Sequence, residues 1–318
     1  MYRHIPVMLN EAIEYLNPQP GEFIADGTLG GGGYTFEIAK RVGPKGKVIA
    51  TDLDEAAIEH AKLKIAREGC ENIIIRQANF SELPEIVEEE LAAEPIKRLH
   101  GVVLDLGLSS AQLDDESRGF SFLKDAPLSM AFGSDLSARR TEGIINLTPV
   151  EGLSKIFREF GEERYANSIA RSIVAVRREH PIRTTKELVE AIHKGVPAVY
   201  RRQRIHFATR SFQALRIATN QELENLSTLL LNIRPILRAD ARIVIISFHS
   251  LEDRIVKQFF KQEAKECICP PQAPLCVCDH KPWLKIITKK AITATDEEIT
   301  LNSRSRSAKL RAAQTLTI

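Results

Sequence analysis

The sequence predicts an α/β fold built on a mostly parallel sheet and interrupted by a helical insertion. Three observations support it. Short apolar runs alternate with helical patterns over the first part of the chain, helical patterning alone follows, and a strand pattern and a helix pattern then return. We therefore expect residues 1–116 and 218–318 to form the two parts of one α/β domain, with residues 117–217 as the helical insertion.

Composition sets the outer limits. The chain has 318 residues, of which 43% are hydrophobic and 27% charged, which is ordinary for a globular protein of one large or two smaller domains. It lacks an apolar run near the ~18 residues that a membrane-spanning helix requires. The amino terminus mixes His4, Asn10 and Glu11 among its apolar positions, unlike a signal peptide. We expect a cytoplasmic protein without a membrane partner.

The most informative motif is the glycine-rich turn Asp26–Thr35, which separates a short apolar run from a helical pattern. A strand, a glycine loop and a helix make a nucleotide-cofactor cradle, because glycine lets the backbone approach a ligand that a Cβ would exclude. No register of these glycines gives G-x-G-x-x-G, and the Gly-Lys-Ser/Thr of a P-loop is absent. A strand-end acid followed by spaced glycines remains, the pattern expected for S-adenosylmethionine. A glycine-rich surface turn is the alternative.

The following elements extend the same half-domain. Residues 46–54 form a second strand pattern that ends in Asp52 and Asp54, and Asp54 lies about 20 residues after the glycines, where a carboxylate meets ribose hydroxyls in Rossmann-like folds. Both acids could instead be ordinary turn residues. Residues 72–80 and 100–107 are predicted as the third and fourth strands.

The later elements complete the pattern. Residues 161–173 and 184–192 are predicted helices of the insertion, the second capped by threonine. A long helix over residues 213–237, a strand over 241–248 and a helix over 252–263 return the chain to the α/β domain.

Charge is distributed unevenly around the total of +2. Residues 1–150 carry a net charge of −9, residues 151–220 carry +7, and residues 221–318 carry +4. A basic middle segment beside an acidic cofactor domain indicates a polyanionic partner. A solvated charged helix face is the alternative.

Several blocks of sequence, spread almost end to end, carry a family resemblance. They are His4–Leu9, Asp26–Thr35, Asp105–Asp114, Arg118–Phe122, Ala208–Ile217, Ser247–Arg254 and Ser303–Arg311. With these blocks in this order, the chain resembles the ribosomal RNA small-subunit methyltransferase H family, bacterial enzymes that methylate the exocyclic N4 of a cytidine in the decoding region of 16S rRNA. The resemblance implies a Rossmann-like class I methyltransferase fold, S-adenosylmethionine as cofactor, and 16S rRNA or the small ribosomal subunit as partner.

The resemblance also implies the cofactor contacts. It assigns the methionine part of the cofactor to Gly32, Gly33 and Tyr34, the ribose to Asp54, and the adenine to Phe80. With the motif residues, the candidate cofactor-binding set is Asp26, Gly30, Gly32, Gly33, Tyr34, Asp54, Phe80, Asp105 and Gln112. The chain departs from the family at Tyr34, which is usually histidine, and in residues 128–132, which are usually Leu-Asp-Met-Arg-Met.

The chemistry predicts the catalytic candidates. Methyl transfer from a sulfonium is an in-line displacement, so the protein must chiefly align donor and acceptor. Cytosine N4 is a poor nucleophile that improves when an acceptor oxygen draws on its amino hydrogens. Asp105 is the candidate acceptor, with Ser109 and Ser110 as secondary ones; a helix cap or a pure cofactor ligand is the alternative for Asp105. His249 is either substrate-facing or structural.

Basic and aromatic residues provide the RNA candidates, because arginine pairs with phosphates and aromatic rings stack on bases. They are Arg201, Arg202, Arg204, Arg210, Phe212 and Arg216. A noncatalytic RNA-binding or ribosome-assembly protein that retains the cofactor fold is the alternative function. The sequence leaves the oligomeric state open.

Four of the five cysteines form two C-x-C pairs, Cys267 with Cys269 and Cys276 with Cys278. A cytoplasmic chain should not rely on disulfides, so these cysteines bind a metal or are idle thiols. Two C-x-C pairs are less typical of zinc than C-x-x-C pairs, and we assign no metal ligands to the predicted active site. Cys70 is predicted to lie in the core.

Overall fold

The computed structural model describes residues 6–95, 97–109, 112–113, 115–133, 141–270, 272 and 275–317. The chain divides into two compact units. The α/β unit comprises residues 1–107 and 223–318, and the helical unit comprises residues 108–222. The predicted insertion, residues 117–217, falls inside the helical unit, whose limits are Leu108 and Glu222.

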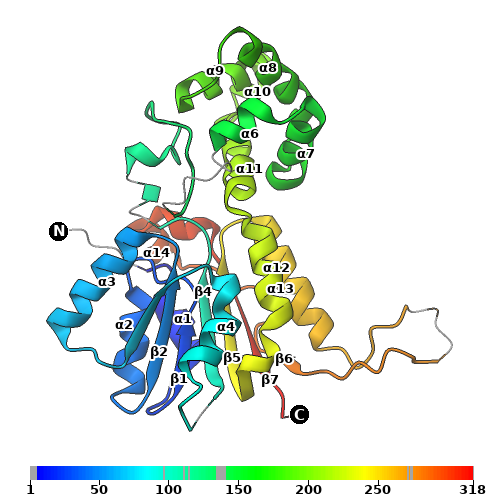
Figure 1. Cartoon of the computed structure of the whole chain (residues 1–318). Coiled ribbons are helices and arrows are strands. Elements are labelled where there is room, and N and C mark those ends of the chain that lie inside the picture. The colour runs from blue at the N-terminus through cyan, green and yellow to red at the C-terminus, as the bar shows by residue number, and fades with distance from the viewer. Residues whose placement is uncertain are drawn as a thin grey trace. The chain divides into compact units, whose positions relative to one another are not determined.

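The α/β unit is built on one seven-stranded sheet (Figure 1). Its strands are β1 (Phe23–Asp26), β2 (Lys47–Asp52), β3 (Ile73–Gln77), β4 (Leu99–Asp105), β5 (Leu237–Ser247), β6 (Leu284–Ile286) and β7 (Lys309–Thr315). They lie in the order β3-β2-β1-β4-β5-β7-β6. The first five strands are parallel, whereas β7 runs antiparallel to both β5 and β6. This is the Rossmann-like order, so the predicted fold class is confirmed.

Helices cover both faces of this sheet. They are α1 (Leu9–Leu16), α2 (Gly33–Val42), α3 (Glu55–Glu68), α4 (Leu83–Glu90), α12 (Glu222–Asn232), α13 (Ser250–Glu263) and α14 (Asp296–Leu301). Successive residues of β1 point to opposite faces: Ile24 joins the apolar cluster of α1 and α2, while Phe23 and Ala25 join that of α4, α12 and α13. Burial on both faces explains the nearly continuous apolar character of these strands.

The helical unit has its own apolar core. Its helices are α6 (Thr141–Leu147), α7 (Val150–Gly161), α8 (Ala166–Glu179), α9 (Thr185–Lys194), α10 (Ala198–Arg201) and α11 (Thr209–Asn220). Thr184 caps α9 in a reciprocal arrangement with Glu187, as the sequence predicts. Among the described residues of this unit, β pairing is limited to an isolated bridge between Pro127 and Thr184.

Three predictions of element boundaries need correction. The predicted helix 161–173 joins the end of α7 to the start of α8, which are separate because Glu162 adopts a left-handed backbone with φ of 47°. The predicted helix 213–237 is two helices, because Gln221 adopts a left-handed backbone with φ of 52° between α11 and α12. The predicted strand 241–248 begins earlier, at Leu237, and the antiparallel strands β6 and β7 were not predicted. Among the described residues, none of the helices combines the length and the apolar character that crossing a bilayer would require.

Candidate active site

The carboxyl ends of β1, β2 and β4 meet at one edge of the sheet, and each ends in an aspartate: Asp26, Asp52 and Asp105. The register pairs Asp26 with Ala50 on β2 and with Val103 on β4. The strand order reverses direction between β1 and β4. Open α/β sheets bind ligands outside such a switch point.

Asp26 shapes the glycine turn from within. It is fully buried; its Oδ1 accepts a hydrogen bond from the Thr28 N–H at 3.0 Å, and its Oδ2 accepts one from the Thr35 hydroxyl at 2.6 Å. The Thr28 hydroxyl in turn accepts the Asp105 N–H at 2.7 Å. Asp26 and Thr28 therefore connect the turn after β1 to the end of β4, which makes Asp26 a positioning residue for the loop.

Asp52 holds the other side of the turn. Its Oδ2 accepts the Gly30 N–H at 2.7 Å, and its Oδ1 accepts the Asp54 N–H at 2.8 Å. Asp54 is 5% exposed and caps α3, accepting the Ala56 N–H at 3.1 Å. The sequence left an ordinary turn residue as the alternative for Asp54, and the structure gives it a helix-capping role. A ribose contact would use a carboxylate that is already fixed in place.

The glycines let α2 begin close to the turn. Gly32 has a φ of 75°, which side-chain-bearing residues rarely adopt, and its N–H donates to the Leu29 carbonyl at 2.7 Å. A Cβ on Gly33 would lie 2.0 Å from the Pro6 ring. Tyr34 is 3% exposed, and its hydroxyl donates to the Val7 carbonyl. The Tyr34 ring therefore packs inside the unit, and a ligand at the turn would meet its backbone.

Asp105, at the carboxyl end of β4, has a buried carboxyl group. Its Oδ1 atom is buried and has no hydrogen-bond partner among the described residues. Burial raises the pKa of Asp105 well above its usual range, and the nearby carboxylates of Asp26, Glu252 and Glu298 raise it further. An unpartnered buried carboxylate oxygen is costly, so its presence points to a ligand that completes it.

The neighbouring acids share this condition. Burial raises the pKa of Asp26 to about 6, and burial likewise raises the pKa of Asp52 and of Glu298. Buried carboxylates favour a positively charged ligand, because a nearby cation offsets the cost of burying their charge. The residues present therefore fit a ligand such as S-adenosylmethionine, which carries a sulfonium and an ammonium group.

With the geometry established, comparisons with known proteins identify the family. The model of the MraW methylase family matches residues 1–316. The chain belongs to the MraW methylase family. A relative named ribosomal RNA small subunit methyltransferase H from Syntrophotalea carbinolica is 46% identical over 317 residues, 99% of each chain. Another of that name from Clostridium botulinum is 47% identical over 98% of this chain and 99% of the relative.

Solved structures give weaker matches to this methylase. Fibrillarin from Aeropyrum pernix, in complex with S-adenosylmethionine, has 9% identity and a TM-score of 0.41, covering 96% of this chain and 73% of that chain. A rRNA methylase from Streptococcus thermophilus has 10% identity and a TM-score of 0.37, covering 97% and 94%. The fold class of the methylase follows from its strand order rather than from these scores.

The remaining cofactor and acceptor candidates fall in both units. Phe80 begins a short turn capped by Asn79 and packs against the core of the α/β unit. Ser109 and Gln112 belong to the helical unit and bond each other: the Ser109 N–H donates to Gln112 Oε1 at 3.0 Å, and the Gln112 N–H donates to Ser109 Oγ at 3.2 Å. Ser110 lies outside the described residues, as do His4 and Ile5 of the first resemblance block.

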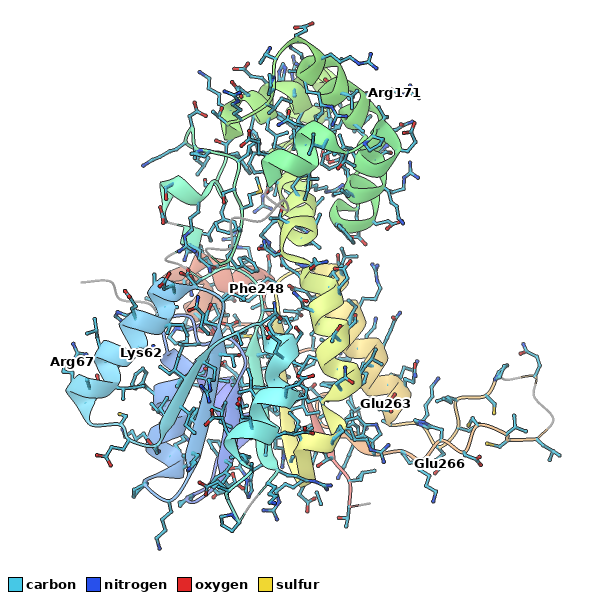
Figure 2. The ribbon with its side chains drawn as sticks, in the orientation of Figure 1. Lys62, Arg67, Arg171, Phe248, Glu263 and Glu266 are labelled. Carbon is cyan, nitrogen blue, oxygen red and sulfur yellow. The ribbon has the colours of Figure 1, made fainter. Side chains whose placement is uncertain are left out.

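His249 follows β5 beside Phe248, which Figure 2 labels at the carboxyl edge of the sheet. The His249 ring caps α13, accepting the Glu252 N–H at 3.5 Å, and Nε2 lies 3.1 Å from Glu252 Oε1. Glu252 Oε2 accepts the Phe248 and His249 N–H groups at 2.9 and 3.3 Å. This capping box gives His249 a structural role. Its buried Nε2 has no hydrogen-bond partner among the described residues, so the substrate-facing role also stays a prediction.

The RNA candidates all lie in the helical unit but differ in exposure. Arg202, Arg204 and Arg210 are exposed, and Arg201 is half-buried with its guanidinium against His193. Arg216 forms a bidentate ion pair with Glu222, in which both N···O distances are 2.8 Å.

Phe212 requires a correction. It is 4% exposed and packs edge-on against Phe122, with ring centroids 5.2 Å apart. A base cannot stack on Phe212 in this arrangement, so we remove it from the RNA-binding set.

Sequence reasoning missed a better aromatic surface in this unit. His206 is exposed, and its ring stacks on half-buried Phe122 with centroids 4.6 Å apart and planes 16° apart. Arg204 lies two residues before His206. Phe122 stands in one of the resemblance blocks, and His206 lies two residues after the basic run that ends at Arg204, so the signal was the proximity of an aromatic ring to that run.

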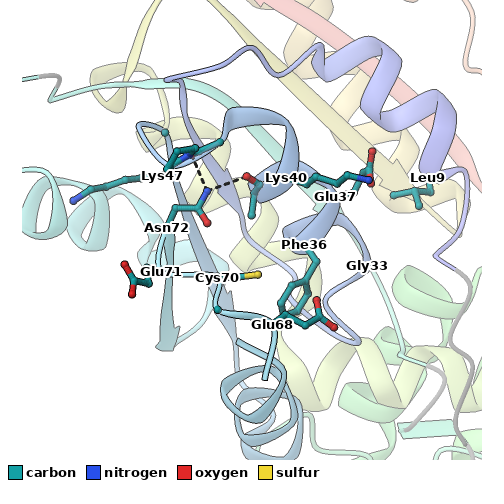
Figure 3. A pocket seen from close by; sticks show the side chains of 15 residues that line it. Leu9, Gly33, Phe36, Glu37, Lys40, Lys47, Glu68, Cys70, Glu71 and Asn72 are labelled. Atoms are coloured by element: carbon teal, nitrogen blue, oxygen red, sulfur yellow. Dashed lines mark hydrogen bonds between the residues drawn. The ribbon is translucent and has the colours of Figure 1, made fainter. Parts of the chain in front are cut away.

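A separate groove of about 780 Å³ runs beside α2 and the end of α3 (Figure 3). Phe36, Lys40, Glu68 and Cys70 are among its lining residues, and it shares Gly33 with the predicted cofactor set. Asp26, Asp54 and Asp105 do not line it. The groove therefore lies apart from the aspartates at the strand ends.

Proposed function

We propose that this methylase transfers the methyl group of S-adenosylmethionine to the exocyclic N4 of a cytidine in the decoding region of 16S rRNA. Membership of a methylase family and the names of its relatives support the reaction class and the rRNA substrate. The observation that carries the N4 acceptor is the buried Oδ1 of Asp105 at the carboxyl end of β4, which has no hydrogen-bond partner within the described part of the chain.

The glycine turn and the strand-end acids would hold the cofactor. At Gly30 a Cβ would meet only the Thr28 carbonyl at 3.8 Å, so the backbone there is open to close approach by a ligand, and Asp54, at the end of the turn after β2, would receive the ribose hydroxyls. S-adenosylmethionine, when bound, supplies a methyl group activated by the sulfonium charge. The same positive charge would stabilise the ionised forms of Asp26 and Asp105 and lower their raised pKa values.

Asp105 would act on the acceptor amine. A carboxylate oxygen that accepts a hydrogen bond from the N4 amino group orients the lone pair of the N4 nitrogen toward the methyl carbon. The same hydrogen bond increases the electron density on that nitrogen. The C–N bond forms as the C–S bond breaks, and the amine then loses one proton. Asp105, whose pKa is raised by burial, is suited to receive that proton.

Mapping of rRNA modifications by mass spectrometry tests the function directly. Deletion of the gene should remove one methyl group from a cytidine of 16S rRNA, and the wild-type gene should restore it. A plasmid-borne Asp105→Ala variant should still bind RNA but fail to restore the methyl group. If deletion leaves every cytidine of 16S rRNA modified as before, the proposal is overturned and the noncatalytic RNA-binding alternative gains.

A further inference from the structure

Between α13 and β6, the described residues 264–270, 272 and 275–283 belong to an arm that extends from the α/β unit (Figure 1). Glu263 and Glu266 mark its base in Figure 2. There the Trp283 N–H donates to the Glu263 carbonyl at 3.1 Å, and Trp283 Nε1 donates to Glu263 Oε2 at 2.6 Å. Trp283 is 3% exposed, so the arm is firmly anchored where it leaves the unit.

Beyond this base, the described part of the arm has little apolar burial to order it. Ile268 is 42% exposed, Leu275 is 77% exposed and Val277 is 81% exposed. A short segment without a hydrophobic core needs a disulfide or a metal to hold one conformation. The arm nevertheless brings four cysteine side chains together.

The sulfur atoms of Cys267, Cys269, Cys276 and Cys278 all lie within 4.8 Å of one another. The sulfur of Cys267 is 3.5 Å from that of Cys276 and 3.8 Å from that of Cys278, and the Cys276 and Cys278 sulfurs are 3.6 Å apart. A tetrahedron of sulfurs around zinc, with Zn–S bonds of about 2.3 Å, has edges of about 3.8 Å. The spacing of the thiols therefore matches the ligand shell of one tetrahedral ion.

We propose that these four cysteines bind one Zn²⁺ ion as a closed Cys₄ site that fixes the conformation of the arm. Because all four positions are filled by protein sulfur, the site is structural and leaves no open position for a substrate. This site is independent of the proposed methyl transfer, which uses the strand-end acids of the sheet.

Backbone hydrogen bonds to sulfur support the assignment. The Cys269 N–H donates to the Cys267 sulfur at 3.4 Å, and the Val277 N–H donates to the Cys269 sulfur at 3.4 Å. Such N–H···S bonds stabilise the thiolate form that zinc requires and orient the ligands. The first of them spans a C-x-C pair, so the local backbone accommodates the short spacing.

Two other occupants fit less well. A disulfide requires an S–S bond of about 2.05 Å. A disulfide between two of these cysteines would leave the other two thiols in contact with the bonded sulfurs, because the four sulfurs lie so close together. Four sulfurs within 4.8 Å of one another enclose a single ion but leave no room for a multi-iron cluster. Among single ions, a tetrahedral shell of four sulfurs selects zinc or iron. We assign zinc, because zinc is redox-inert and therefore suits a purely structural site.

Elemental analysis of the purified full-length protein tests the proposal. We expect about one zinc per chain, loss of that zinc in Cys276→Ser and in Cys278→Ser, and retention in Cys70→Ser, which removes the half-buried cysteine outside the arm. Replacement of zinc by Co²⁺ should give the intense visible absorption of a tetrahedral thiolate site. Limited proteolysis should cut the wild-type arm only after a chelator or a thiol-modifying mercurial removes the metal.

Three results would overturn the proposal. Protein that contains no metal while all five thiols react freely with Ellman's reagent would make the cysteines idle. A mass lower by one or two pairs of hydrogens would show disulfides, and stoichiometric iron would assign the site to another ion. Circular dichroism of the cysteine variants, expected to match wild type, guards against loss of the whole fold.

Discussion

The two units of this methylase place their charges in opposite settings. In the α/β unit, the aspartates of the candidate cofactor site are buried. Asp26 is fully buried, Asp54 is 5% exposed, and the buried Oδ1 of Asp105 has no hydrogen-bond partner among the described residues. In the helical unit, Arg202 and Arg204 are exposed. Buried charges interact through a low effective dielectric, whereas exposed charges are screened by water and salt. Single substitutions should therefore have large effects in the first unit and small, additive effects in the second.

The largest effect is expected at Asp105. Asp105→Ala removes the acceptor oxygen for N4, and loss of one well-placed catalytic group costs about 10²-fold or more in rate. Single-turnover methylation of small-subunit RNA at saturating cofactor measures the step. Asp105→Asn keeps one acceptor oxygen but no charge, so its rate should lie between those of Asp105→Ala and wild type. A wild-type rate in Asp105→Ala would mean that Asp105 only binds the cofactor or braces the site.

The next effect is a pH dependence that originates from Asp26. Its pKa is about 6 in the folded protein, whereas an unfolded aspartate titrates near 4, so the folded state binds more protons between these values. The contribution of Asp26 to the free energy of unfolding therefore falls as pH rises through this window, by on the order of 3 kcal/mol.

Denaturant unfolding of wild type and of Asp26→Asn at pH 4 and pH 7 isolates the contribution of Asp26 titration to the free energy of unfolding. Asparagine retains the shape of the side chain and can bond Thr28 and Thr35 without titrating. Relative to the variant, wild type should lose stability between the lower and the higher pH. A difference that is the same at both values would show that Asp26 titrates normally.

How far the sequence predicted these sites depends on the range of the contacts. The strand-end acids and the capping of α9 were predictable, because periodicity and capping depend on neighbours a few residues away. The burial of Phe212 was not, since it depends on Phe122 from a distant segment. Local patterns also do not encode the antiparallel strand β7, which pairs with the remote β5. Nor do they encode the convergence of the arm cysteines, which depends on a reversal of the chain between the two C-x-C pairs.

Asp54 should give a more moderate effect. Asp54→Ala is expected to weaken S-adenosylmethionine binding by about 1 to 3 kcal/mol, the cost of leaving polar ribose groups unpaired. The Asp54 carboxylate also caps α3, so the variant should lose some stability. Asp54→Asn separates the two roles, because asparagine is an equally good cap but lacks the charge. Calorimetry with unchanged affinity in Asp54→Ala would remove Asp54 from the cofactor site.

His206, whose exposed ring stacks on Phe122, should contribute a similar or smaller amount of free energy to RNA binding. Stacking of a base on an aromatic side chain is worth about 1 to 3 kcal/mol. We expect His206→Ala to weaken binding of small-subunit RNA while leaving cofactor affinity unchanged. His180→Ala, an exposed histidine at the end of α8, is the matched control. Equal RNA affinities for both variants would assign the Phe122–His206 pair to packing alone.

The smallest effects are expected from the basic run itself. Each arginine that contacts a phosphate contributes about 1 to the slope of log affinity against log salt, and neutralising it should flatten the slope by that amount. Arg202 and Arg204 are exposed, whereas the Arg201 guanidinium is held against His193. The triple change of Arg201, Arg202 and Arg204 to glutamine should therefore flatten the slope by about 2 rather than 3. The double change Arg171→Gln with Arg178→Gln removes exposed charge from α8 and serves as control. If the triple variant retains the wild-type slope, the run is a solvated face, and Arg304, Arg306, Lys309 and Arg311 become the next candidates. Of these, Lys309 and Arg311 already pair with Asp253 at 3.5 and 2.6 Å, so the exposed Arg306 should be tested first.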